Sequence, residues 1–89
     1  MANLYLINKT YGENGLKLAR LDADAEVVLI QDGVYIDARD FVGSKTKIYV
    51  LRHDVEKRGL EDRVRQDVKL IDYGQFVDLI VQNKVINFA

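Results

Sequence analysis

The sequence contains no cysteine, no proline and no tryptophan, and it has a single histidine, His53. Without cysteine the chain can form no disulfide and offers no thiolate nucleophile. A lone histidine also excludes a histidine-based metal site built within one chain. The single serine, Ser44, lies in a predicted turn that precedes a strand, away from the strand ends where α/β proteins place their sites. The sequence therefore predicts no catalytic residues, no metal site and no cofactor.

An excess of charge of either sign is also absent, as are long apolar runs. The 13 basic and 14 acidic residues leave a formal net charge of −1, which gives no electrostatic reason for tight binding to nucleic acid or membranes. No segment approaches the roughly 18 apolar residues that a membrane helix needs. The first nine residues lack the basic start and apolar centre of a signal peptide. We therefore expect a cytoplasmic protein that binds neither membranes nor nucleic acid directly.

The size of the chain predicts one domain, spanning residues 1–89. A domain this short buries roughly 60–65% of its unfolded surface, so its stability is marginal without further support. Because 48% of the residues are hydrophobic and no disulfide can form, association with other subunits is the expected source of that support.

The apolar residues that are present predict a parallel sheet. Val27–Ile30 is an unbroken apolar run, typical of a strand that is covered on both faces. Three other runs resemble it, and together the expected strands are Asn3–Asn8, Val27–Ile30, Lys47–Leu51 and Val68–Ile71. Val85–Phe88 either adds an edge strand or packs as irregular chain.

Helical patterns alternate with these strands. Leu16–Leu21 and residues 34–42 predict the first two helices, and Asp54 is expected to cap a short helix that ends at Gly59. The clearest helical stripe has apolar residues at i, i+3, i+4, i+7 and i+8: Tyr73, Phe76, Val77, Ile80 and Val81. The predicted fold is α/β: a single small domain with a mainly parallel sheet of about four strands and helices on both faces.

Polar clusters follow the predicted strands and should gather along one edge of the sheet. They are Asn8-Lys9-Thr10, Gln31-Asp32-Gly33, Arg52-His53-Asp54 and Asp72-Tyr73. One interpretation is a ligand site or a docking edge. The other is that these residues serve as helix caps and turns, for which their side chains are well suited. An enzyme working through Asp32, His53 or Asp54 is the weakest of the readings.

Four segments of the chain resemble one known family. Val28-Leu29-Ile30-Gln31-Asp32-Gly33-Val34 resembles the LLQDGV signature of the DsrH/TusB family of sulfur-relay subunits. The segments at 6–10, 48–60 and 68–79 resemble other pieces of the family pattern in the same order. The residues that match the signature are Gln31, Asp32, Gly33, Asp72 and Tyr73, and we take them as a candidate strand-end site or interface.

The resemblance implies a DsrE-like, Rossmann-like three-layer fold and assembly with homologous DsrE/DsrF-like (TusD/TusC-like) subunits that pass persulfide sulfur. In the Tus branch that sulfur is used for tRNA wobble-uridine 2-thiolation, and in the Dsr branch for sulfur oxidation. Family members that carry a cysteine tend to place it in the first helical region, where this chain has Leu16-Lys17-Leu18-Ala19. The sequence therefore indicates a non-catalytic relay subunit. The alternative is a stand-alone homo-oligomer of the same fold, with a small-molecule-binding or structural role.

Overall fold

A computed structural model describes residues 2–89, and its centre is one sheet of five parallel strands in the order β4-β3-β2-β1-β5. The strands are β1 (Asn3–Ile7), β2 (Ala25–Leu29), β3 (Lys47–Leu51), β4 (Val68–Ile71) and β5 (Lys84–Phe88). The parallel α/β sheet predicted from the apolar runs is confirmed. Of the two alternatives for Val85–Phe88, the edge strand is confirmed, because β5 pairs with β1 along its full length.

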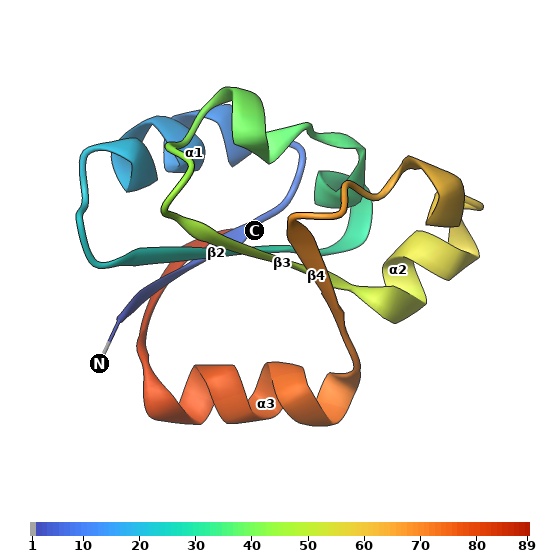
Figure 1. Cartoon of the computed structure of the whole chain (residues 1–89). Helices are drawn as coiled ribbons and strands as arrows, with labels where there is room; N and C mark the ends of the chain where they lie inside the picture. Colours follow the sequence, from blue (N-terminus) through green and yellow to red (C-terminus); the bar gives the residue numbers. More distant parts are fainter. Residues whose placement is uncertain (1) are drawn as a thin grey trace.

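Helices cover both faces of this sheet, as predicted (Figure 1). The α-helices are α1 (Gly12–Arg20), α2 (Arg52–Lys57) and α3 (Tyr73–Gln82), and the 3₁₀ turns are η1 (Gln31–Tyr35), η2 (Ala38–Asp40) and η3 (Glu61–Arg63). In Figure 1, α1 lies above the sheet, α3 lies below it, and α2 stands beside the end of β3. Within residues 2–89, no helix has the length and apolar character needed to cross a bilayer.

The central strand β2 has apolar neighbours on both sides. Val27 and Val28 point to opposite faces, and both side chains are completely buried. Val27 lies in the larger core beneath α1 with Ile7 and Leu16, whereas Val28 lies in the smaller core beneath α3 with Leu4. The doubly covered strand predicted from the run Val27–Ile30 is therefore confirmed.

Residues 34–42 do not form the predicted helix, and this expectation was wrong. The segment makes the two short 3₁₀ turns η1 and η2, which are separated by extended backbone at Ile36. A continuous α-helix would point Ile36 away from the face shared by Val34 and Ala38, because two residues correspond to about 200° of rotation. The break lets Val34, Ile36 and Phe41 all pack against the core that contains Ala38.

Two other helix boundaries differ from the prediction. Helix α1 begins at Gly12 and not at Leu16, and a Cβ atom at Gly15 would come within 2.6 Å of Ile7 Cδ1. The glycines thus let the first turn approach the sheet closely. Helix α2 begins at Arg52, so Asp54 lies inside its first turn and does not cap it. The predicted stop at Gly59 is confirmed, with a φ of +65° that suits glycine.

Helix α3 has the predicted span but a different buried face. Asp72 caps it through a reciprocal pair of hydrogen bonds with Gln75. Phe76 and Ile80 of the predicted stripe, together with Leu79, pack against the sheet. The rest of the stripe faces outward, since Tyr73, Val77 and Val81 are 53%, 54% and 78% exposed. The helix therefore carries an outer apolar strip made of these three residues.

Candidate functional site

The ends of β1, β2 and β3 are joined by polar contacts, which we call the strand-end network. Asn8 Nδ2 donates a hydrogen bond of 2.7 Å to Gln31 Oε1. The backbone N–H of Gln31 donates another, also 2.7 Å long, to Asp54 Oδ2. Three of the four polar clusters predicted to gather at this edge therefore meet there.

Arg58 completes the strand-end network from one turn further along the chain. Its Nε lies 3.0 Å from Asp32 Oδ1. Its NH1 donates to the backbone carbonyl of Asp54 and lies 3.6 Å from that residue's carboxylate. One guanidinium thus holds the two acids of neighbouring strand ends, and Asp54 is the only charged side chain buried within residues 2–89.

The backbone at the QDG sequence has two unusual features. Gln31 has a φ of +51°, and among residues 2–89 it is the only non-glycine residue in the left-handed region. That conformation costs a residue with a side chain about 1–2 kcal/mol. Two residues later, a Cβ atom at Gly33 would come within 2.2 Å of the carbonyl oxygen of Ile7. The signature therefore contains one strained residue and one position where only glycine fits.

The remaining two candidate residues lie apart from Gln31. Asp72 follows β4, two strands from β2, which places it about 10 Å away at the usual strand spacing. Its carboxylate is occupied by the backbone N–H of Gln75 at the start of α3. Tyr73 lies next to a residue of the third polar cluster, because its ring centroid is 5.5 Å from that of His53. Asp72 thus acts as a helix cap, and Tyr73 is a partly exposed aromatic residue beside His53.

Sequence reasoning placed Asp54 at this edge but expected it to cap a helix, and it did not identify Arg58 as part of the network. The signal that could have identified them is their spacing, since an acid and an arginine four residues apart lie on one helix face. The side chains of the network are held by hydrogen bonds and ion pairs within the chain. No group of three or more metal-ligating side chains occurs within residues 2–89.

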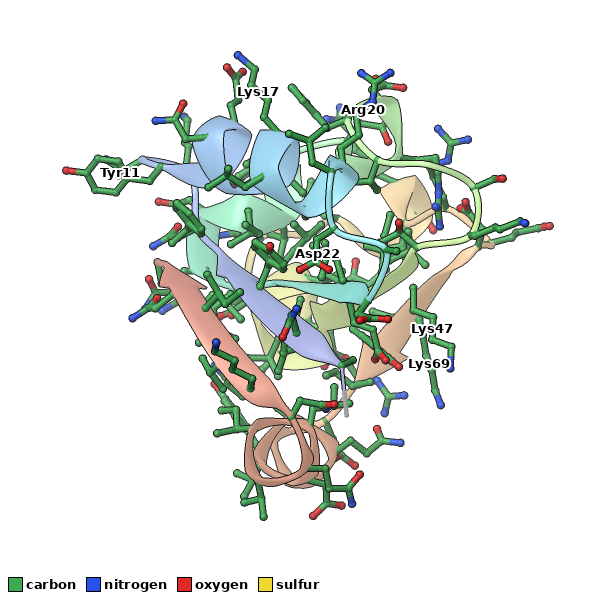
Figure 2. The ribbon with its side chains drawn as sticks, turned by 90° about the vertical axis from the view of Figure 1, so that its left-hand side faces the viewer. Tyr11, Lys17, Arg20, Asp22, Lys47 and Lys69 are labelled. Atoms are coloured by element: carbon green, nitrogen blue, oxygen red, sulfur yellow. The ribbon has the colours of Figure 1, made fainter. Side chains whose placement is uncertain are left out.

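A second polar contact group lies at the opposite ends of the strands. Asp22 accepts hydrogen bonds from Asn3 Nδ2 at 2.8 Å and from the Tyr5 hydroxyl at 2.9 Å. Together with the Asp24 backbone N–H, these donors lower the pKa of Asp22, the Asn3 amide having the largest effect. In Figure 2, Asp22 points inward beneath α1, whereas Lys17 and Arg20 point away from it. Asp22 is therefore a structural residue of its loop.

Comparison with known protein families identifies the family of this chain. A family described as "DsrH like protein" matches residues 13–86, a span that includes the QDG sequence and all of α3. The chain belongs to the DsrH family. The family resemblance seen in the sequence is thus confirmed.

Curated relatives of this DsrH-family chain are named Protein TusB. Those from Pectobacterium parmentieri and Photorhabdus laumondii are 38% identical to it over 72 and 74 residues. The one from Escherichia coli K12 is 36% identical over 72 residues. Each alignment covers 74% of this chain, and 76%, 73% and 76% of the respective relatives.

A solved structure with the same fold is the ychN protein from E. coli. It superposes with a TM-score of 0.81 over 99% of both chains, at 13% sequence identity. At this identity the likeness concerns the fold alone. It confirms that the DsrH-family chain adopts a known α/β architecture.

Proposed function

We propose that this protein is a non-catalytic subunit of a sulfur-relay complex that serves tRNA wobble-uridine 2-thiolation. The observation that carries the proposal is the match to the DsrH family over residues 13–86, together with TusB relatives that cover three quarters of the chain. The absence of cysteine from the sequence supports a role in which another subunit carries the sulfur.

The partners that fit this role are cysteine-bearing homologous subunits of the DsrE/DsrF (TusD/TusC) type. A persulfide forms on a thiolate, and this chain has none to offer. Its contribution is then to shape the assembly and to cover the partner's cysteine. A rigid, fully hydrogen-bonded strand-end network suits such a part better than it suits chemistry.

Two neighbouring surfaces support subunit association. The first is the edge formed by Gln31, Asp32, Gly33, Asp72 and Tyr73, which we propose as the interface with the partner. The second is the outer apolar strip of α3, whose three side chains are more than half exposed in the isolated chain. Tyr73 belongs to both surfaces and therefore links them. Water-exposed apolar residues grouped in this way are typical of protein contact sites.

The test is a sulfur-transfer experiment on the complex purified from the native organism. After incubation with a ³⁵S-labelled persulfide donor, we expect label on a co-purifying cysteine-bearing subunit and none on this chain. Removing this chain from the complex should lower transfer to the acceptor and reduce 2-thiouridine in tRNA.

The Asp32→Ala variant tests the edge within the same experiment, and Asp24→Ala is its matched control. Asp24 is an exposed aspartate near the opposite ends of the strands. We expect Asp32→Ala to weaken co-purification and Asp24→Ala to leave it unchanged. A partner that transfers sulfur equally well without this chain would overturn the relay role. The stand-alone homo-oligomer would then be the better account.

A further inference from the structure

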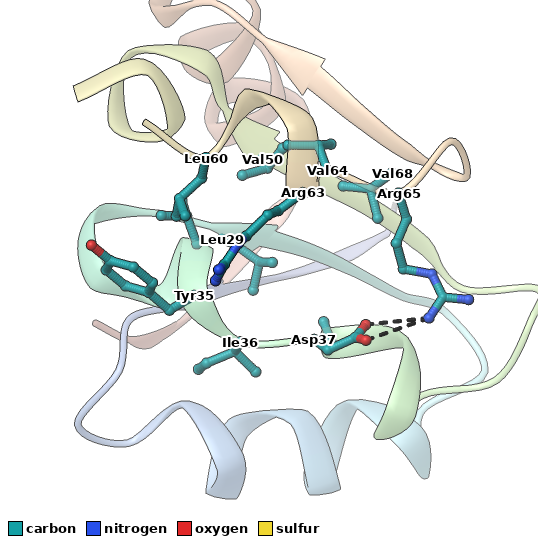
Figure 3. Close-up of a pocket in the computed structure, with 12 residues that line it drawn as sticks. Leu29, Tyr35, Ile36, Asp37, Val50, Leu60, Arg63, Val64, Arg65 and Val68 are labelled. Carbon is teal, nitrogen blue, oxygen red and sulfur yellow. Dashed lines mark hydrogen bonds and ion pairs between the residues drawn. The ribbon is translucent and has the colours of Figure 1, made fainter. Parts of the chain in front are cut away.

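A cavity of about 220 Å³ lies between η1, η3 and the sheet, on the face that also carries α1. Its floor consists of Leu29, Val50 and Val68, one residue from each of β2, β3 and β4. Leu60 and Val64 close it from the segment around η3 (Figure 3). The 3₁₀ turns that replace the expected helix cover this part of the sheet incompletely, and the cavity results.

The lining combines an apolar floor with four residues that carry polar groups. Eight of the twelve lining residues are aliphatic, and the others are Tyr35, Asp37, Arg63 and Arg65. The cavity opens to solvent, and its lining presents both apolar and polar surface. Its volume suits a small organic molecule that combines an apolar body with a polar group.

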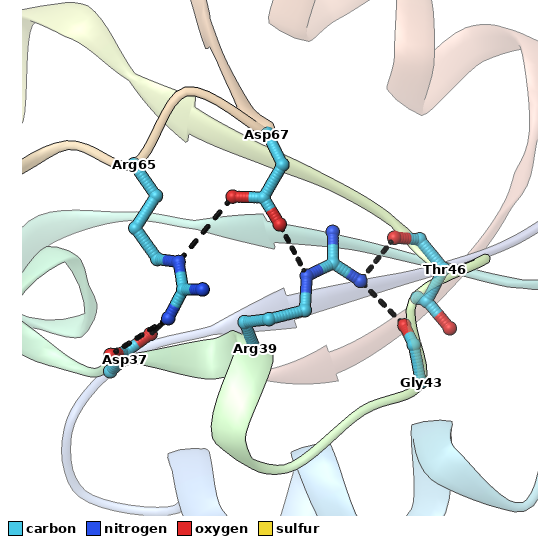
Figure 4. Close-up of polar contacts among 6 residues, drawn as sticks. All are labelled: Asp37, Arg39, Gly43, Thr46, Arg65 and Asp67. Carbon is cyan, nitrogen blue, oxygen red and sulfur yellow. Dashed lines mark hydrogen bonds and ion pairs between the residues drawn. The ribbon is translucent and has the colours of Figure 1, made fainter.

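The two arginines differ in their partners. Arg65 NH1 lies 3.4 Å from Asp37 Oδ2, and its Nε lies 3.5 Å from Asp67 Oδ1. Asp67 in turn accepts from Arg39 at 2.7 Å, so Arg65 belongs to a group of paired charges (Figure 4). Arg63 makes no ion pair and no side-chain hydrogen bond within residues 2–89.

Arg63 is also the arginine that enters the cavity. Figure 3 shows its side chain crossing the opening from η3 toward Tyr35, while Arg65 points to Asp37 at the rim. A guanidinium without a carboxylate partner, placed over an apolar floor, is suited to an anionic group attached to an apolar body. Its planar fork of N–H donors matches a carboxylate in two parallel hydrogen bonds.

We propose that this cavity binds a small carboxylate with an aromatic or branched aliphatic body. The apolar part would lie on Leu29, Val50 and Val68, and the carboxylate would pair with Arg63. The Tyr35 side chain, which is 55% exposed, stands at the opening opposite η3. The inference goes beyond the relay role and does not depend on it, because the cavity is formed by residues of this chain alone.

The test uses the full chain labelled with ¹⁵N and the probe phenylacetate. We expect saturable shifts of the amide signals of Tyr35, Asp37 and Val64 as the probe is added. The uncharged analogue 2-phenylethanol should bind at least tenfold more weakly. Arg63→Gln should weaken phenylacetate binding at least tenfold, whereas Arg65→Gln, which removes an arginine already paired with two acids, should weaken it less than threefold.

Three results would overturn the proposal. One is the absence of shifts at the lining residues up to the solubility limit of phenylacetate. Another is equal affinity for phenylacetate and 2-phenylethanol, which would mean that Arg63 does not bind the carboxylate. The third is equal loss in both arginine variants, which would indicate a general charge effect. The folded spectrum of each variant, recorded in the same titration, separates loss of binding from loss of structure.

Discussion

The carboxylate of Asp54 accepts a hydrogen bond of 2.7 Å from the backbone N–H of Gln31, the residue with a φ of +51°. A buried acid on one strand end thus holds the strained backbone of the next. The energetic cost at Gln31 is offset by contacts from two other elements, since Asn8 binds its side chain as well. The geometry of the QDG sequence therefore depends on residues outside it.

The first prediction concerns the strain at Gln31. Gln31→Gly removes the conformational cost and also the hydrogen bond with Asn8, whereas Gln31→Ala removes that hydrogen bond and keeps a Cβ atom at the positive φ. We expect Gln31→Gly to be more stable than Gln31→Ala by about 0.5–1 kcal/mol, since glycine adopts positive φ without a steric penalty. Urea denaturation of both variants measures the difference. A Gln31→Gly variant that is less stable than Gln31→Ala would show that the backbone is not strained.

The second prediction concerns the close approach at Gly33. Gly33→Ala places a methyl group against the carbonyl oxygen of Ile7, and backbone cannot yield as a flexible side chain does. We expect a loss of about 2–3 kcal/mol in the free energy of unfolding. Gly43→Ala is the control, because a Cβ atom there meets no atom within 4 Å. It should stay within about 0.5 kcal/mol of the parent protein. Equal losses in the two variants would refute the steric argument.

The third prediction concerns alkaline pH. Burial, helped by the hydrogen bond of 3.0 Å to Glu26, raises the pKa of Tyr49 to about 12. The usual tyrosine value is about 10, so the folded state binds this proton more tightly than the unfolded state does. The resulting stabilisation is fully present below about pH 10 and is lost as the pH rises from about 10 to about 12.

Tyr49→Phe should remove this part of the alkaline loss, as measured by urea denaturation at several pH values. Glu26→Gln keeps the phenol and removes the neighbouring charge, so the pKa of Tyr49 should fall towards its usual value. The loss should then be smaller and should end at a lower pH than in the parent protein. The chain has five tyrosines, so the difference in tyrosinate absorbance at 295 nm between the parent protein and Tyr49→Phe follows the titration of Tyr49. An unchanged pH dependence in both variants would contradict the assignment to Tyr49.

The fourth prediction concerns the outer apolar strip of α3. Val77→Lys combined with Val81→Lys changes two exposed side chains, so the free energy of unfolding should stay within about 0.5 kcal/mol. Association with subunits should nevertheless be lost, and sedimentation velocity measures it. Ile80→Ala is the control on the inner face, where we expect a loss of about 2 kcal/mol and no direct effect on association. Unchanged sedimentation of the double variant would exclude this strip as an interface.

The sequence predicted the sheet well because unbroken apolar runs have few alternatives in a short chain. Lys47–Leu51 and Val68–Ile71 match their strands residue for residue. The break in the helical pattern at Ile36 could not be predicted in this way, because it depends on where the core lies relative to residues 34–42. The hydrophobic periodicity of a segment describes that segment in isolation. Ile36, however, packs among residues from several elements.

The candidate site was predicted in part. The ends of parallel strands gather at one edge by topology, so Gln31, Asp32 and Gly33 could be placed there from the sequence. The strained backbone at Gln31 could not, because its conformation is fixed by Asp54 and Asn8, which are 23 residues away on either side. Asp72 was grouped with these residues because it matches the family signature, and in the structure it caps the N-terminus of α3.

The pairing of β1 with β5 sets the order in which the domain can be completed. β1 is the first strand of the chain, yet one of its two hydrogen-bonding edges is filled by the last, through the pairs Asn3–Lys84 to Ile7–Phe88. During synthesis this edge stays open until residue 88 has been made, and contacts between such distant segments form late in folding. A nascent chain arrested before β5 would expose the unpaired edge of β1, a largely apolar strand, and such edges are protected by chaperones and prone to aggregation.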